Sequence, residues 1–389
     1  MASKRILVVD DSCLFQRLLS DAVNARPGLE VIGVASNGRV ALDMVQDLKP
    51  DLVTLDILMP ELDGIQTLTE IKRHWPDVVT MMVSSLTVDG SDAALDALAL
   101  GAGDCAVKPQ SSGGIEDIRQ KLEQDFIPKL EALCGLDVVE CDLSDDHVEP
   151  EQPHFSDLPE SELVECAQIK LVAIGVSTGG PDALGQLLPQ LPVDLEVPIV
   201  IVQHMPAEFT AKLAARLDQA SALKVVEAKQ GESIQSGMVY IAPGDNHMVL
   251  SAKHKRVFVS LNKNPPENSC RPAVDVLFRS ISTLYEDQCL GIVMTGMGQD
   301  GLKGAQALHA AGSRLLVQDQ ESSVVWGMPK LIAKAGLAEA QVPLKSMAAE
   351  IVSRVRRSIR NAEANSRSQP IENKLLETLR TPTPSSSRA

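Results

Sequence analysis

Short apolar runs alternate with amphipathic segments through the first third of the chain. Each run has the length and aliphatic content of a strand buried on both faces, and each intervening segment has helical spacing of its apolar positions. The predicted strands are RILVV from Arg5, VIGVA from Val31, DLVTLD from Asp51, VVTMMVS from Val78 and CAVKP from Cys105. The predicted helices cover residues 12–24, 38–48, 64–74, 89–100 and 113–133. This alternation predicts an α/β domain with an open, doubly wound parallel sheet.

A second series of buried-strand patterns begins near Ile169. LVAIGV from Leu171 runs directly into a glycine-rich turn and a helical pattern, and similar apolar runs are VPIVIV from Val197 and LGIVM from Leu290. We therefore expect a second doubly wound parallel-sheet domain, with the Rossmann-like arrangement of helices on both faces of a sheet.

Composition changes between the two series. From Asp137 to Cys166 there are eleven Asp or Glu, three Pro and no Lys or Arg, so this stretch cannot bury enough apolar surface to order itself. The predicted organisation of the 389 residues is a first domain at 1–133, an acidic flexible linker at 134–167, a second domain at 168–358 and a disordered tail at 359–389. A basic amphipathic helix at 345–360 closes the second domain.

Charge and cysteine usage exclude several classes. The formal net charge of −16 comes mostly from the linker, and no concentrated basic face argues for nucleic acid binding. The seven cysteines form no C-x-x-C pair, which predicts neither a zinc site nor a disulfide framework. No run reaches the length of a membrane span, and the N-terminus lacks the layout of a secretory signal, so we expect a cytoplasmic protein without membrane insertion.

Three predicted strands of the second domain each end in a polar residue. Ser177 follows the first strand, His204 follows VPIVIVQ, and Asp300 lies in the glycine-rich segment after LGIVM. Serine is a weak nucleophile without a base, and imidazole needs a carboxylate to hold its tautomer. Because the carboxyl ends of parallel strands share one edge of a sheet, these residues predict a Ser-His-Asp hydrolase site.

Alternatives to this triad exist. A serine in a strand-to-helix turn is often only an N-cap, and His247, which also follows a strand, is the reserve candidate for the base. Gly-Val-Ser-Thr-Gly matches the nucleophile elbow of α/β-hydrolases, but the order here is Ser, His, Asp, whereas that fold uses Ser, acid, His. A dinucleotide site is weaker, because the G-x-G-x-x-G spacing is absent.

The first domain also collects polar residues at its predicted strand ends. Three carboxylates, Asp10, Asp11 and Asp56, would repel one another unless a divalent cation lies among them, and hard oxygen ligands suit Mg²⁺. Ser84 and Lys108 end the fourth and fifth strands and would contact the oxygens of a phosphoryl group.

These motifs, LVVDDS at 7–12, LDILMPELDG at 55–64, MVSS at 82–85 and AVKP at 106–109, resemble the flavodoxin-like receiver domain of two-component response regulators. The resemblance implies that Asp56 accepts a phosphoryl group from a histidine kinase. It also implies that Asp10, Asp11, Asp56 and the backbone carbonyl of Leu58 bind Mg²⁺. The switch position that is commonly aromatic in such domains is Cys105 here.

The second domain resembles the catalytic domain of the CheB family of chemotaxis protein-glutamate methylesterases. The matching segments are IGVSTGGP, IVQHMP, RPAVDVLFRS, VMTGMGQDG and QDQESSVVWGMP, and a receiver followed by this domain is that family's arrangement. The resemblance implies hydrolysis of γ-glutamyl methyl esters, and deamidation of glutamines, on methyl-accepting chemoreceptors. Ser177 would be the nucleophile, His204 the base and Asp300 its orienting acid. Backbone near Met297 would supply the oxyanion donor, with Thr178 beside the nucleophile.

Gating is expected from the pairing of the two domains. The unphosphorylated receiver would cover the Ser177 cleft, and phosphorylation of Asp56 would shift the equilibrium toward an open arrangement. An alternative is a non-catalytic adaptor that docks on chemoreceptors when phosphorylated. A DNA-binding response regulator has little support, because no helix-turn-helix pattern follows the linker.

Overall fold

The computed structural model describes residues 3–84, 88–109, 114–136, 167–254 and 256–380. Its first domain is a five-stranded parallel sheet in the order β2-β1-β3-β4-β5, which is the flavodoxin-like order. The strands are β1 (Lys4–Val9), β2 (Leu29–Ala35), β3 (Leu52–Asp56), β4 (Val79–Ser84) and β5 (Asp104–Val107). The doubly wound parallel sheet predicted for the first domain is confirmed.

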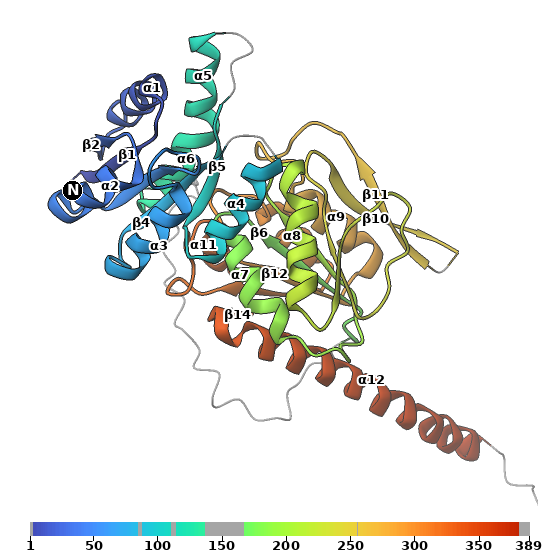
Figure 1. Ribbon diagram of the computed structural model, residues 1–389. Helices are drawn as coiled ribbons and strands as arrows, with labels where there is room; N and C mark the ends of the chain where they lie inside the picture. The colour runs from blue at the N-terminus through green and yellow to red at the C-terminus, as the bar shows by residue number, and fades with distance from the viewer. Residues whose placement is uncertain (1–2, 85–87, 110–113, 137–166, 255, 381–389) are drawn as a thin grey trace, which may run out of the picture.

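Helices cover both faces of this sheet (Figure 1). They are α1 (Cys13–Asn24), α2 (Gly38–Leu48), α3 (Gly64–His74), α4 (Val88–Ala99), and a last helical run of α5 (Ile115–Lys121), the π-helical turn η1 (Leu122–Phe126) and α6 (Ile127–Leu133). The residues that follow α6 still pack on this domain, since Cys134 is buried and Leu136 contacts the same apolar cluster. The rest of the predicted linker, 137–166, lies outside the described residues.

The second domain is built on a seven-stranded parallel sheet in the order β14-β13-β12-β6-β7-β9-β8. These strands are β6 (Leu171–Val176), β7 (Ile199–Gln203), β8 (Lys224–Glu227), β9 (Met238–Ile241), β12 (Cys289–Val293), β13 (Arg314–Gln318) and β14 (Ala340–Val342). An antiparallel pair, β10 (His247–Lys253) and β11 (Arg256–Asn262), accompanies the sheet. The predicted doubly wound α/β domain is therefore confirmed.

Its helices form the outer layers of the domain. They are α7 (Gly180–Leu187), the 3-10 turn η4 (Leu188–Gln190), α8 (Ala207–Ala220), α9 (Val274–Tyr285), α10 (Leu302–Ala310), α11 (Met328–Lys334) and α12 (Leu344–Arg380). In Figure 1, α12 extends well beyond the body of the domain. The disorder predicted from residue 359 is therefore wrong as far as Arg380, because adding residues to a formed helix avoids the cost of a new nucleus.

One apolar cluster spans the two domains, beside a separate cluster within each. α4 of the first domain lies against α7 and α8 of the second (Figure 1), and Leu95 and Leu98 belong to the same buried cluster as Phe209 and Leu213. Ion pairs flank this seam: Lys212 Nζ lies 2.7 Å from Asp92 Oδ2, and Arg216 pairs with Asp96. Since exposed pairs contribute only about 0–1 kcal/mol each, the apolar contact is the main attraction.

Candidate active site and receiver site

The candidate triad lies at one edge of the seven-stranded sheet. β6 carries Ser177 at its end and is flanked by β7, which leads to His204, and by β12, which leads into the loop with Asp300. All three residues are largely buried: the exposed fraction is 8% for Ser177, 2% for Asp300 and 12% for the His204 side chain. The parallel topology thus brings together residues that lie far apart in the sequence, as predicted.

Asp300 is the most firmly held member. Its Oδ2 lies 2.8 Å from His204 Nε2 and accepts the backbone N–H of Val274 at 2.6 Å. Its Oδ1 accepts N–H groups of Asp275, Gly301 and Asn268, each at 3.0 Å. Burial favours the neutral acid, but the hydrogen bond from His204 and these N–H donors outweigh it and lower the pKa of Asp300. A fixed carboxylate of this kind can orient an imidazole.

His204 has both ring nitrogens engaged. Nε2 faces Asp300, and Nδ1 lies 3.5 Å from the sulfur of Cys270. Burial favours neutral imidazole, but Cys270 and Asp300 favour the cation and raise the pKa of His204 to about 10. In this arrangement the ring holds a proton at neutral pH and is therefore a poor base.

Ser177 is adjacent to the pair but not joined to it. Within the described part of the chain, no hydrogen bond connects the Ser177 hydroxyl to His204. The contacts of Ser177 are made by its backbone: its N–H donates to Thr295 O at 3.0 Å, and its carbonyl accepts Gln203 Nε2 at 3.0 Å. The predicted proton relay is thus complete between Asp300 and His204 and incomplete at Ser177, because Cys270 occupies the remaining ring nitrogen.

A glycine turn lies directly over the nucleophile. A Cβ on Gly296 would stand 2.7 Å from Ser177 Cβ and 2.6 Å from Met328 Sδ, so only glycine permits this approach. The Gly296 N–H is taken by Val325 O, whereas among described residues the N–H of the next residue, Met297, donates to none. The turn that approaches Ser177 therefore includes a backbone N–H, that of Met297, with no partner among the described residues.

His247, the reserve base, has a structural role instead. Its Nε2 faces Pro265 O at 3.1 Å and its Nδ1 accepts Ala273 N–H at 3.2 Å, so it links β10 to the loop before α9. At 1% exposure it is shielded from substrate.

The predicted phosphorylation site is also assembled. Lys108 Nζ lies 2.7 Å from Asp10 Oδ2 and 2.9 Å from Asp56 Oδ2. Oxygens of Asp10, Asp11 and Asp56 lie within 4.8 Å of one another, which suits one small cation. Burial, with a smaller contribution from the charge of Asp56, raises the pKa of Asp10 to about 6, although the hydrogen bond from Lys108 lowers it. Leu58 N–H reaches Asp56 Oδ1 at 3.4 Å, and its carbonyl as a cation ligand stays a prediction.

Ser84 connects this site to α4. It is fully buried at the end of β4, and its Oγ donates to Gly90 O within α4 at 2.8 Å. Because α4 packs on the second domain, a change at Ser84 has a direct route to that surface. Cys105, the unusual switch residue, is half-buried in β5, and burial raises the pKa of its thiol to about 12.

A cavity of about 700 Å³ separates the two sites. Its wall includes Lys108, Cys105 and Lys129 from the first domain and His204 and Cys270 from the second. At its edge the buried Asp104 of β5 accepts the hydroxyl of Thr178 at 2.9 Å and pairs with Lys129 at 3.2 Å. The first domain therefore contacts the residue next to the nucleophile.

Comparison with known proteins decides the family. A family model described as CheB methylesterase matches residues 172–351, and one described as response regulator receiver domain matches 6–122. A protein-glutamate methylesterase/protein-glutamine glutaminase of Trichodesmium erythraeum is 44% identical over 91% of this chain and 100% of its own length. One from Desulfotalea psychrophila is 42% identical over 92% and 100%. This chain belongs to the CheB family.

A solved structure is similar as well. The CheB methylesterase catalytic domain of Thermotoga maritima is 42% identical, covering 48% of this chain and 99% of its own, with a TM-score of 0.47. The CheB resemblance and the α/β fold inferred from the sequence are both confirmed. None of these relatives supports the adaptor alternative.

Three contacts at this CheB site were not predicted from the sequence: Cys270 at His204, Asn268 at Asp300, and Asp104 at Thr178. Each depends on tertiary packing. The only sequence signal was that Cys270 directly precedes the RPAVDVLFRS segment.

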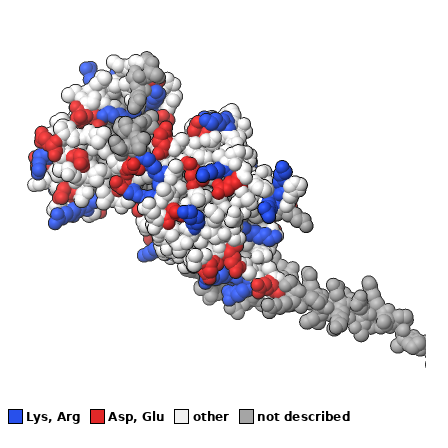
Figure 2. All heavy atoms as spheres, turned by 45° about the vertical axis from the view of Figure 1, so that its right-hand side comes forward, with Lys and Arg blue, Asp and Glu red and all other residues white. Residues whose placement is uncertain are grey.

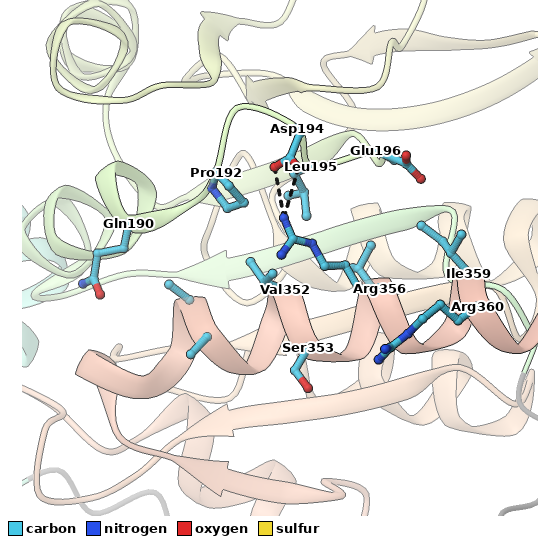
Figure 3. Close-up of a pocket in the computed structure, with 13 residues that line it drawn as sticks. Gln190, Pro192, Asp194, Leu195, Glu196, Val352, Ser353, Arg356, Ile359 and Arg360 are labelled. Atoms are coloured by element: carbon cyan, nitrogen blue, oxygen red, sulfur yellow. Dashed lines mark hydrogen bonds and ion pairs between the residues drawn. The ribbon is translucent and has the colours of Figure 1, made fainter.

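A second groove in the described part of the chain is lined by no member of the triad. A groove of about 870 Å³ runs along α12, where Arg356 pairs with Asp194 beside Leu195 and Val352 (Figure 3). Acidic and basic side chains alternate over the face seen in Figure 2, without the single-sign field that nucleic acid binding requires. None of the described helices is both long and apolar enough to cross a bilayer.

Proposed function

We propose that this protein is a phosphorylation-activated serine hydrolase that demethylates γ-glutamyl methyl esters, and deamidates specific glutamines, of methyl-accepting chemoreceptors. The observation that carries the proposal is full-length similarity to protein-glutamate methylesterase/glutaminases together with an Asp300–His204 pair beside Ser177. The proposed place of action is the cytoplasm, where a histidine kinase and the signalling parts of receptors would meet it.

In the first step, Ser177 Oγ attacks the ester carbonyl. His204 takes the hydroxyl proton on Nδ1, while Asp300 holds Nε2–H and stabilises the imidazolium. The N–H of Met297 is the proposed donor to the oxyanion, and one such donor contributes on the order of 3 kcal/mol to the barrier reduction. Thr178 keeps the turn beside the nucleophile in place.

His204 then passes its proton to the leaving group. Methanol departs from an ester, or ammonia from a glutamine, and a γ-glutamyl ester of Ser177 remains. Water, deprotonated by His204, attacks this ester, and Ser177 leaves with the proton. The net products are a glutamate carboxylate and methanol or ammonia.

Asp56 is the proposed phosphoryl acceptor, with Mg²⁺ on Asp10, Asp11, Asp56 and the Leu58 carbonyl. The oxygen-only donor set and its spacing fit Mg²⁺. The ion would offset the negative charge of the phosphoryl group during transfer. Lys108, held between Asp10 and Asp56, would then contact a phosphoryl oxygen.

The receiver would inhibit the enzyme through two contacts. Asp104 holds Thr178, and α4 packs on α7 and α8. A phosphoryl group on Asp56 would attract the Ser84 hydroxyl away from Gly90 and so weaken the packing of α4 against the second domain. With the receiver moved away from the cavity that His204 lines, the ring could shift Nδ1 from Cys270 toward Ser177.

The test is methanol release from receptor membranes carrying labelled methyl esters. With Mg²⁺ and beryllium fluoride as phosphoryl mimic, we expect release to rise about 5–150-fold, the range of a 1–3 kcal/mol coupling. Equal rates with and without the mimic would reject gating. No release in either condition would reject the hydrolase.

Ser177→Ala separates the enzyme from an adaptor. We expect methanol release to fall about 10⁴-fold or more, because the oxyanion donor and substrate binding retain only part of the acceleration once the nucleophile is removed. Binding to receptor membranes serves as the control and should not change. A variant that still restores receptor adaptation in cells would favour the adaptor.

A further inference from the structure

Cys270 forms a second chemical unit with the catalytic base. Its sulfur lies 3.5 Å from His204 Nδ1, while His204 Nε2 lies 2.8 Å from Asp300 Oδ2. One ligand atom from each of these three residues lies within 4.8 Å of the other two. Hydrolysis by a Ser-His-Asp triad has no need of a thiol at this place.

The position of Cys270 is fixed by a tight turn. Glu267 and Cys270 exchange backbone hydrogen bonds of 3.1 and 2.8 Å, and the residues between them, Asn268 and Ser269, have φ of 51° and 60°. An ion pair of 2.6 Å between Arg279 and Glu267 ties the turn to α9. Asn268 also donates to Asp300, so the turn that carries the thiol is anchored to the triad.

The ligand spacing suits a tetrahedral ion. Zinc binds Cys sulfur at about 2.3 Å and His nitrogen at about 2.0–2.1 Å, which places two such atoms about 3.5 Å apart at a tetrahedral angle. The observed separation of Cys270 Sγ and His204 Nδ1 is 3.5 Å. Metal-binding imidazoles usually donate their other N–H to a carboxylate, which is the role of Asp300 here.

The cavity between the domains gives an ion access. His204 and Cys270 both line this space of about 700 Å³, which has room for the water or substrate ligands that complete a coordination shell. Thiolate and imidazole are the donors that favour zinc over Mg²⁺ or Ca²⁺.

We propose that His204 Nδ1 and Cys270 Sγ bind a zinc-class divalent cation that inhibits the enzyme. On binding, the S–H bond of Cys270 and the Nδ1–H bond of the protonated His204 ring break, and both protons leave to solvent. The thiolate and the Nδ1 lone pair then bond to the ion without any redox change. Inhibition follows because Nδ1 is the nitrogen that Ser177 needs. The inhibition rests on the proposed hydrolase function, whereas the metal binding does not.

Binding is tested with Co²⁺ as a spectroscopic substitute for zinc, on the full chain, with excess Mg²⁺ and a non-thiol reductant. We expect sulfur-to-cobalt charge-transfer absorption that saturates at one ion per chain. Cys270→Ala and His204→Ala should each lose it, while Cys13→Ser, which removes an exposed thiol, should keep it. Unchanged absorption in Cys270→Ala would overturn the proposal.

Inhibition is tested by zinc titration of methanol release, with each variant compared to its own metal-free rate. We expect the zinc concentration for half-inhibition to rise at least tenfold in Cys270→Ala, and a chelator to restore the wild-type rate. Equal zinc inhibition of the wild type and Cys270→Ala would overturn the proposal. So would recovery of the wild-type rate with a reductant but not with a chelator. An absent metal-free rate together with intact cobalt binding would instead reject the hydrolase function alone.

Discussion

The chemistry of the site depends on the state of a single side chain, His204. Its Nε2 is correctly placed on Asp300, but its Nδ1 faces Cys270 and its pKa is raised to about 10. A protonated imidazole cannot accept the Ser177 proton. The arrangement is therefore that of an inactive enzyme. Asp300 and His204 are paired, but His204 Nδ1 is not hydrogen-bonded to the Ser177 hydroxyl.

The raised pKa of His204 predicts a pH dependence. A base with a raised pKa becomes available only as pH rises, so the unphosphorylated rate should increase up to about tenfold per pH unit between pH 7 and 9. Cys270→Ala removes one cause of the shift and should move the rise to lower pH. Methanol release is measured against Ser177→Ala, which corrects for spontaneous hydrolysis. A flat wild-type profile over this range would contradict the prediction.

The loop after β12 does two jobs for the site. It places Asp300 under His204, and its glycine turn brings backbone against Ser177. The carboxylate is held there because α9 begins beside it, so the N–H groups of Val274 and Asp275 point at Asp300. One loop and one helix start thus set both the orienting acid and the space over the nucleophile.

Gly296→Ala tests the close approach. The added methyl would meet Ser177 Cβ at 2.7 Å and must displace the turn or the nucleophile. We expect methanol release to fall about 10²-fold, since a displacement near 1 Å costs this much in oriented catalysis. Gly185→Ala in α7 is the matched control, because nothing lies within 4 Å of its Cβ. Equal rates of methanol release in the two variants would show that the close approach of Gly296 to Ser177 is not needed for catalysis.

The two domains meet at a seam that is apolar at its centre and polar at its rim. The shared cluster of α4 and α8 supplies the attraction, while Asp104 and Lys129 reach the active-site edge. Phosphorylation has to overcome only part of this contact to shift the balance, because a few kcal/mol separate the populations of two such arrangements.

Asp104→Ala tests the polar rim. The variant loses the hydrogen bond from Thr178 and the ion pair with Lys129. Loss of one hydrogen bond to a charged group weakens the closed arrangement by about 1.5 kcal/mol. We expect the unphosphorylated methanol release to rise about tenfold, and the rate with beryllium fluoride to change little. Asp77→Ala, at an exposed receiver position, is the control. An unchanged basal rate would show that Asp104 does not restrain the enzyme.

The amino-acid sequence alone determined the two parallel-sheet domains and the residues at their strand ends. Apolar runs and glycine turns are local signals, and parallel topology then assigns Ser177, His204 and Asp300 to one edge. Tertiary structure alone decided which of these residues touch. The partners of the imidazole, the approach of Gly296, and the contact from Asp104 to Thr178 join segments distant in sequence. Distance and orientation across a packed core depend on every intervening side chain, and no local pattern encodes them.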